Sequence, residues 1–293
     1  MISFFIVILP ALFMWEFAAI KVNFRLPKAA RKRLFKLGGR FALLALVIET
    51  VEGLVPLKGL PPGWHAFIQA FLMAAVTEEL VKFAAVNKFG RKELDELGPG
   101  VAILLAVGAS LGFAVLETKL YVLHGGLIVW AIRAVSAIPM HAIFGFVMGS
   151  FMVLAWRNPL RFDERMLVLA LVVPIIFHFA YDFPLMLHDY DKTLVWPQRL
   201  EPVIMLVEGL FALILTNHAV NGATAIYGRT QPADPRGHRA LGFACVTMVL
   251  MFLCLALGQE LHLATTFAVL AAMPLVLTLD LGLLAYVRSR TSY

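Results

Sequence analysis

The stretch LIVWAIRAVSAIPMHAIFGFVMGSFMVLAW, residues 127–156, decides the fold. Its only ionisable side chains are Arg133 and His141. A helix needs about 20 mostly apolar residues to cross the hydrocarbon core of a bilayer. Backbone N–H and C=O groups in lipid must be satisfied within the spanning segment itself, which a helix achieves. The stretch therefore predicts a transmembrane helix.

The same apolar pattern recurs along the chain. Of its 293 residues, 61% are hydrophobic and 15% are charged, and the mean hydropathy is +0.84. Soluble domains average about 45–50% apolar and about 25% charged residues. We therefore predict an all-α polytopic transmembrane helix bundle of about nine spans, forming a single integral membrane domain over residues 1–293. The predicted spans are 2–20, 41–55, 64–86, 100–123, 127–156, 166–187, 202–226, 241–257 and 263–287.

Lys and Arg residues gather in every second predicted loop. They are concentrated at 21–40, 88–92, 157–165, 229–239 and 288–290, whereas the intervening loops carry few. Because cytoplasmic loops are enriched in Lys and Arg, this alternation predicts an N-terminus outside and a C-terminus inside. It also accounts for the net charge of +6 without a nucleic-acid partner. The two cysteines, Cys245 and Cys254, lie in one apolar run and suggest no disulfide or metal motif.

The third predicted span carries the first group of ionisable side chains. Glu78 and Lys82 are four residues apart and share a helical face, while Glu79 is three residues from Lys82. Ionisable side chains are costly inside a bilayer and therefore mark functional sites. Two adjacent carboxylates repel each other and Lys82 attracts both, so one of them is suited to act as a general base near neutral pH.

The next two predicted spans each add one ionisable group. Glu117 lies in an apolar segment, one turn after Phe113. His141 is followed at one-turn intervals by Gly145 and Gly149, a spacing of small residues that lets a neighbouring backbone approach closely. A hydrogen bond to a neighbouring helix would also account for a lone histidine.

The sixth predicted span pairs His178 with Asp182 on one helical face. An aspartate one turn from a histidine can fix its tautomer, or both can bind one metal ion. Four consecutive spans thus carry acids or bases at membrane depth. If these groups converge, they form a polar chamber that can hold water, a base and donors for a developing oxyanion.

Other polar residues in the spans are interpreted mostly as structural. Arg133 lies eight residues before His141, on roughly the same face, and can pair with a carboxylate. The remaining members of this set are Glu49, Glu52, Glu208, Asn217 and His218.

Four short motifs follow one another, one on each of the four spans. They are Glu78-Glu79-x-x-Lys82, Phe113-x-x-x-Glu117, His141-x-x-x-Gly145 and His178-x-x-x-Asp182. This ordered set resembles the PrsW family of intramembrane proteases, which is related to the CAAX-prenyl endopeptidase and Abi family. The resemblance covers about residues 64–187, which would be the catalytic helices.

The resemblance implies hydrolysis of a peptide bond in a single-span, membrane-anchored substrate such as an anti-sigma factor. It also implies a bacterial or archaeal plasma membrane. In the CAAX branch a glutamate of the EE motif activates water, and by position that role falls to Glu78. That branch has a histidine in place of Glu117 and favours asparagine in place of Asp182. With two carboxylates at these positions, the present residues are closer to a metal-binding set.

The resulting hypothesis makes Glu78 the general base, with Glu79 and Lys82 tuning and orienting it. His141 and His178 stabilise the oxyanion or protonate the leaving amine, and Asp182 orients His178. Glu117 shares the water or joins a metal shell.

Two versions of this mechanism stay open. One uses no metal. The other uses Zn²⁺ held by a set drawn from His141, His178, Asp182 and Glu117, since two histidines with a carboxylate form a known hydrolytic zinc arrangement. A secondary transporter or proton relay, and a non-catalytic membrane scaffold, are the alternatives to a protease.

Overall fold

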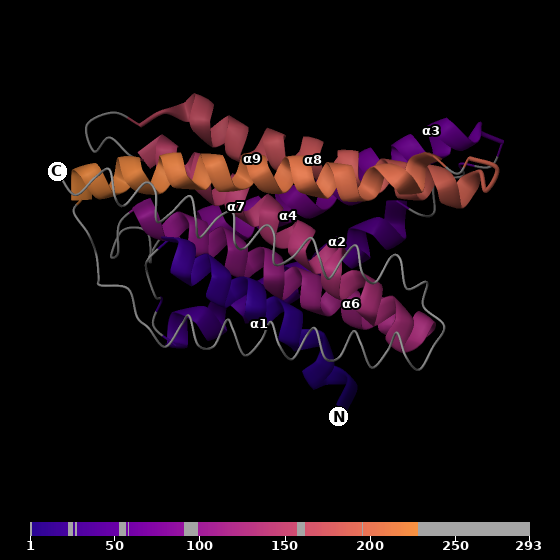
Figure 1. Cartoon of the computed structure of the whole chain (residues 1–293), viewed down its shortest axis with the longest axis horizontal. Helices are drawn as coiled ribbons and strands as arrows, with labels where there is room; N and C mark the ends of the chain where they lie inside the picture. The colour runs from indigo at the N-terminus through magenta and orange to yellow at the C-terminus, as the bar shows by residue number, and fades with distance from the viewer. Residues whose placement is uncertain are drawn as a thin grey trace. The chain divides into compact units, whose positions relative to one another are not determined.

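The computed structural model describes residues 2–22, 26, 28–52, 57, 59–90, 99–156, 162–194 and 196–227. All of them lie in one compact unit, Met1–Ala240. Within these residues the secondary structure is helical and no strand occurs, which confirms the all-α class (Figure 1). The two predicted spans at 241–257 and 263–287, together with Cys245 and Cys254, lie outside the described residues.

In the described part of the chain, four helical segments are long and apolar enough to cross a membrane. They are Ala102–Leu123, Val129–Trp156, Glu164–Tyr190 and Leu200–Ala223, and they match the fourth to seventh predicted spans. The long α-helices among the described residues are α1 Ile2–Val22, α2 Lys28–Glu52, α6 Ala102–Val135, α7 Ala137–Trp156, α8 Glu164–Tyr190 and α9 Trp196–Tyr227. The chain is thus a polytopic helical membrane protein, while nine spans and the orientation of the termini stay predictions.

α2 differs from the short span predicted at 41–55. It begins at Lys28, because the Lys-, Arg-, Ala- and Leu-rich stretch before residue 41 consists of good helix formers. Most of the basic residues assigned to the first loop therefore lie on the first turns of a helix. One of them, Arg31, forms an ion pair with Glu16 of α1 at 3.5 Å.

The third predicted span is a helix that alternates between α and π geometry. Its parts are α3 Pro62–Phe67, the π-helix η1 Ile68–Val76, α4 Thr77–Ala84 and the π-helix η2 Ala85–Phe89. In an α-helix nine residues make two and a half turns, so Gln69 and Glu78 would lie on opposite sides. A π-helix closes its hydrogen bonds over five residues and turns more slowly, which brings the two onto one side. Both residues line the same cavity.

α6 contains a reversal that separates the fourth and fifth predicted spans. Gly126 has a φ of 68° and a ψ of −156°, a conformation open to glycine because it lacks Cβ. Arg133 Nε donates to Thr118 Oγ1 at 3.2 Å, which a straight helix of fifteen residues could not allow. Residues 127–135 therefore run back along the first part of α6. A second break at Ser136 divides the fifth predicted span, and α7 begins at Ala137.

α6 and α7 form the centre of this unit. Their spanning segments are 72% and 83% buried, against 28% for α8 and 22% for α9. α6 packs against α1 and α2 on one side, and α7 packs against α8 and α9 on the other. The central pair thus carries Glu117 and His141 where neither faces lipid.

Glycines let the α6 and α7 backbones touch. A Cβ on Gly145 would lie 2.8 Å from Val107 Cα, and a Cβ on Gly149 would collide with Ile103 Cα. The close approach predicted from the spacing of these glycines is confirmed. It sets the distance between Glu117 and His141, which lie on the two helices.

We expect Gly149→Ala to destabilise the protein. The added methyl group would press on the α6 backbone, and overpacking costs about 1–3 kcal/mol. The midpoint of thermal unfolding in detergent should fall by several degrees. Gly209→Ala on α9 is the control, because its Cβ would lie 3.6 Å from Ile143 Cδ1, an ordinary contact. A Gly149→Ala midpoint equal to that of the control would contradict the packing described here.

Candidate functional site

A lysine ammonium group lies at the centre of the ionisable residues. Lys82 Nζ contacts Glu78 Oε2 at 3.0 Å, Glu79 Oε1 at 2.7 Å and His141 Nδ1 at 3.0 Å. Its side chain is 1% exposed. An ammonium group has three N–H donors and no acceptor, so all three are used and His141 Nδ1 must accept. The prediction that Lys82 can reach both glutamates is confirmed.

His141 links Lys82 to Glu117 through hydrogen bonds at its two ring nitrogens. Because Nδ1 accepts from Lys82, the ring hydrogen lies on Nε2 and donates to Glu117 Oε2 at 2.8 Å. Arg133 Nη2 donates to the same oxygen at 2.7 Å. The predicted pairing of Arg133 with a carboxylate is thus confirmed, and the carboxylate is Glu117.

His178 lies between carboxylates on both sides. Its Nδ1 is 3.0 Å from Glu79 Oε1, and its Nε2 is 3.0 Å from Asp182 Oδ2 and 4.0 Å from Glu78 Oε2. The expected contact between His178 and Asp182 is present. Phe144 of α7 stacks on the imidazole, with ring centroids 4.9 Å apart and planes at 22°. The ring is therefore held by packing as well as by hydrogen bonds.

The seven residues predicted for the site form one continuous network across four helices. Glu78, Glu79 and Lys82 come from α4, Glu117 from α6, His141 from α7, and His178 and Asp182 from α8. Phe113 of the second motif lies beneath Lys82, with Nζ 4.4 Å from the ring centroid. This cation–π contact gives the aromatic residue of that motif a role in holding the ammonium group.

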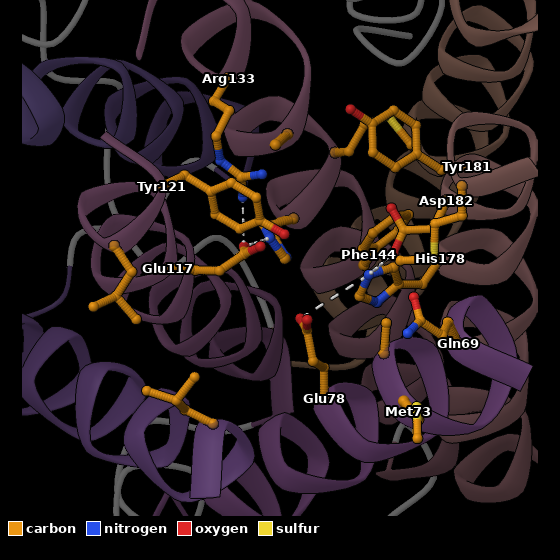
Figure 2. A pocket seen from close by; sticks show the side chains of 17 residues that line it. Gln69, Met73, Glu78, Glu117, Tyr121, Arg133, Phe144, His178, Tyr181 and Asp182 are labelled. Carbon is orange, nitrogen blue, oxygen red and sulfur yellow. Dashed lines mark hydrogen bonds and ion pairs between the residues drawn. The ribbon is translucent and has the colours of Figure 1, made fainter. Parts of the chain in front are cut away.

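A cavity of about 550 Å³ opens onto part of this network. Figure 2 shows Glu78, Glu117 and His178 directed toward a common space, with Arg133 and Tyr121 to one side. Glu78 lines the cavity, whereas Glu79 and Lys82 lie behind it with side chains 0% and 1% exposed. The structure therefore distinguishes the two adjacent glutamates, since Glu78 alone of the two reaches the space that a substrate would enter.

Residues outside the predicted set also line the cavity. They are chiefly Gln69, Tyr121, Arg133 and Tyr181. The spacing of Arg133 from His141 indicated that Arg133 could reach the site. Nothing in the sequence indicated the same for Gln69, because α-helical periodicity places it opposite Glu78. Glu208 of α9 is buried and its Oε2 has no hydrogen-bond partner among the described residues. The side chains of Glu49 and Glu52 lie outside the described part.

The donor types suit a metal ion in two overlapping groups. Glu78, Glu79 and His178 form one, and Glu78, Glu117 and His141 form the other, with candidate ligand atoms within 4.8 Å of one another in each. The expected set of His141, His178, Asp182 and Glu117 is thus divided between the two groups, and Asp182 belongs to neither. Carboxylates with a histidine are ligands that Zn²⁺ accepts.

The hydrogen bonds compete with such a metal. His141 uses Nδ1 to accept from Lys82 and Nε2 to donate to Glu117. Both nitrogens of His178 face carboxylates. A metal ion could use either imidazole only after Lys82 or a ring hydrogen had been displaced, because ligation needs the free lone pair of a neutral imidazole.

A helical membrane protein with a buried network of acids and bases at a cavity is the class that the fold and the site define. A family model described as PrsW family intramembrane metalloprotease matches residues 27–215. The chain belongs to this family.

Curated relatives agree with the family model. The chain is 32% identical to "Protease PrsW" of Shouchella clausii over 154 residues, which are 52% of this chain and 67% of that protein. It is 31% identical to the protein of that name from Oceanobacillus iheyensis over 178 residues, 60% of this chain and 79% of the relative. It is 32% identical to "Protease PrsW" of Bacillus subtilis over 123 residues, which are 41% of this chain and 56% of that relative. No solved structure matches significantly. The chain is thus an integral bacterial membrane protein of a protease family.

We expect Lys82→Met to destabilise the protein strongly. It would leave two buried carboxylates without their shared cation, and breaking a buried ion pair costs about 3–5 kcal/mol. Thermal unfolding in detergent measures the loss. Lys192→Met is the matched control, because Lys192 pairs with Asp189 at 2.7 Å on the surface and exposed pairs contribute about 0–1 kcal/mol. Equal unfolding midpoints for the two variants would show that the ammonium group does not hold the cluster.

Proposed function

We propose that the chain is an intramembrane endopeptidase that hydrolyses a peptide bond in a membrane-anchored protein with water activated by Glu78. The observation that carries the proposal is the position of this carboxylate at the cavity. Its candidate ligand oxygen lies within 4.8 Å of that of Glu117. One water molecule can bridge two acceptors at that separation with two ordinary hydrogen bonds. The nucleophile would therefore lie between Glu78 and Glu117.

In the proposed first step, the oxygen of this water attacks the peptide carbonyl carbon and Glu78 takes a proton. The carbonyl π bond breaks and its electron pair goes to the oxygen, which forms a tetrahedral oxyanion. In the second step the electron pair of the oxyanion re-forms the carbonyl π bond, and the C–N bond breaks as the nitrogen receives the proton that Glu78 took. His178 is placed for this transfer, because its Nε2 lies 4.0 Å from Glu78 Oε2.

The remaining residues of the network act by holding these groups. Lys82 and Glu79 fix Glu78 and His178 from behind the cavity, and Asp182 orients His178 through Nε2. His141 has both ring nitrogens directed at Lys82 and Glu117, so its geometry favours a positioning role over a direct contact with the oxyanion. Such support is what keeps an active-site geometry fixed before the substrate arrives.

We further propose that the reaction proceeds without a bound metal. The Lys82 ammonium group already supplies a positive charge among Glu78, Glu79 and His141. Where Zn²⁺ is bound, the ligands would be Glu78, Glu117 and His141, and the metal would polarise the carbonyl and activate water. The competition between Lys82 and a metal ion for this cluster favours the metal-free version.

The extent of the cavity indicates on which side of the membrane the substrate is cut. From Glu78 and Phe144 it continues past Gln69, Tyr121 and Met186. These residues lie toward the helix ends that join the sparsely basic loops, which the charge pattern places outside the cell. We therefore propose that a single-span substrate, such as an anti-sigma factor, is cut in the outer half of the membrane.

We expect Glu78→Gln and His178→Ala to abolish cleavage of a single-span substrate on co-expression. Glutamine is nearly isosteric but cannot take the proton, and loss of a general base costs about 10²–10⁴-fold. Immunoblotting for the cleaved fragment measures the effect, with Lys192→Met as a control far from the cavity. Cleavage that persists in both variants would reject the assigned site and reopen the transporter and scaffold alternatives.

We expect the purified protein to contain less than stoichiometric zinc and to keep its activity after dialysis against a chelator. Elemental analysis and cleavage of a reporter substrate, run on the same preparation, measure both. Stoichiometric zinc whose removal and return switch activity off and on would reject the metal-free version and leave the protease assignment in place.

A further inference from the structure

We propose that Arg133 is a catalytic residue whose guanidinium group donates hydrogen bonds to the oxyanion of the tetrahedral intermediate. The inference rests on the proposed peptide hydrolysis and adds to it the group that binds the developing negative charge. Such a donor accelerates the hydrolysis of an amide, because the carbonyl oxygen becomes a negatively charged alkoxide in the tetrahedral intermediate.

The other cations and imidazoles of the site are already committed. All three donors of Lys82 are used, and Lys82 does not line the cavity. His141 donates its one ring hydrogen to Glu117. His178 faces Glu79 and Asp182 with its two nitrogens. The proposed proton transfer to the leaving nitrogen also occupies Nε2 of His178, so none of these three groups keeps an N–H for the oxyanion.

Two uncharged donors that line the cavity, Tyr181 and Gln69, are poorly placed for this role. Tyr181 directs its hydroxyl hydrogen to Glu201 Oε1 at 3.4 Å. Gln69 accepts from Tyr190 at 2.6 Å and lies about two helical turns from Glu78 along the same helix. A donor for the oxyanion must instead lie close to the water between Glu78 and Glu117.

Arg133 meets that requirement. It lines the cavity, and its Nη2 is 2.7 Å from Glu117 Oε2. A guanidinium group has five N–H donors. Its bonds to Glu117 and Thr118 use two of them, one from Nη2 and one from Nε. The two Nη1 hydrogens and the second Nη2 hydrogen have no hydrogen-bond partner among the described residues and can bind a substrate.

The guanidinium plane is fixed before substrate binds. Its Cζ lies 4.1 Å from the centroid of the Tyr121 ring, and Nε is anchored to Thr118 Oγ1 at 3.2 Å. In Figure 2 the side chain reaches down past Tyr121 to Glu117, beside the space that Glu78 faces. Donors that are oriented in advance stabilise an oxyanion without reorganisation, which is the source of their catalytic effect.

The reversal at Gly126 makes this placement possible. It returns residues 127–135 along the first part of α6, so that Arg133 lies next to Thr118 and Glu117 rather than far beyond them. The residue thus enters the site from a segment that none of the four sequence motifs includes.

The test compares Arg133→Met, Arg133→Lys and Arg133→Ala with the parent in detergent, using a fluorogenic peptide or single-span substrate. We expect Arg133→Met to lower kcat about 10²–10³-fold with little change in KM, the range found when one oxyanion donor is removed. Arg133→Lys should retain part of the activity, because it keeps the charge but not the fork of donors. Added guanidinium should restore part of the Arg133→Ala activity. Lys119→Met is the control, since it removes a cation from the same helix outside the cavity.

A second measurement separates this role from support of Glu117. A phosphinic peptide carries a charged oxygen where the oxyanion forms, so its inhibition constant should rise in Arg133→Met by about the same factor as kcat/KM falls. Binding of an uncleaved substrate to the Glu78→Gln background should change little on adding Arg133→Met.

The outcomes distinguish the two proposals. Activity in Glu78→Gln would reject the proposed function. An inactive Glu78→Gln together with an Arg133→Met within threefold of the parent would reject only the oxyanion role. If Arg133→Met unfolds at a lower temperature than the parent, the activity of Arg133→Lys and the rescue of Arg133→Ala by guanidinium test the oxyanion role instead. A folded Arg133→Lys with full activity and unchanged phosphinate binding would overturn the proposal, as would the lack of any rescue.

Discussion

The three hydrogen bonds of one buried ammonium group hold the site together. Lys82 binds two glutamates of its own helix and His141 of α7, and through them it reaches Glu117 and His178. Without a cation at this point, burying two adjacent carboxylates would be costly. With it, part of their negative charge is neutralised within a few ångströms, and the four helices gain a common polar centre. Lys82 thus connects groups from all four helices, directly or through one intervening residue.

Much of the site could be predicted from the sequence, because its residues are costly in a membrane and stand out from an apolar background. The pairs Glu78–Lys82 and His178–Asp182 follow from α-helical spacing, and both contacts are present. The convergence of the four helices required the ordered motifs. The tautomer of His141 and the burial of Glu79 behind Glu78 could not be predicted, because both depend on contacts between helices.

The misses have physical causes as well. α2 is longer than its apolar core because basic residues are good helix formers, so hydropathy alone places its start too late. The reversal at Gly126 follows from one backbone conformation, which a long apolar run conceals. The spacing of Arg133 from His141 predicts an ion pair with a carboxylate but does not identify Glu117, which lies on the far side of that reversal. These differences concern where a helix begins and where the chain reverses, and they leave the helical nature of the segments unchanged.

The π-helix η1 places Gln69 and Met73 on the same side of their helix as Glu78, so that all three line the cavity. Over Ile68–Val76 the slower winding brings Gln69, Met73 and Glu78 into phase. With one residue fewer in η1, this segment could relax into an ordinary α-helix. The part that carries Gln69 would then rotate about the helix axis relative to the part that carries Glu78. The number of residues between Gln69 and Glu78 therefore matters as much as their identity. Insertions and deletions in this segment should be tolerated less well than most point substitutions.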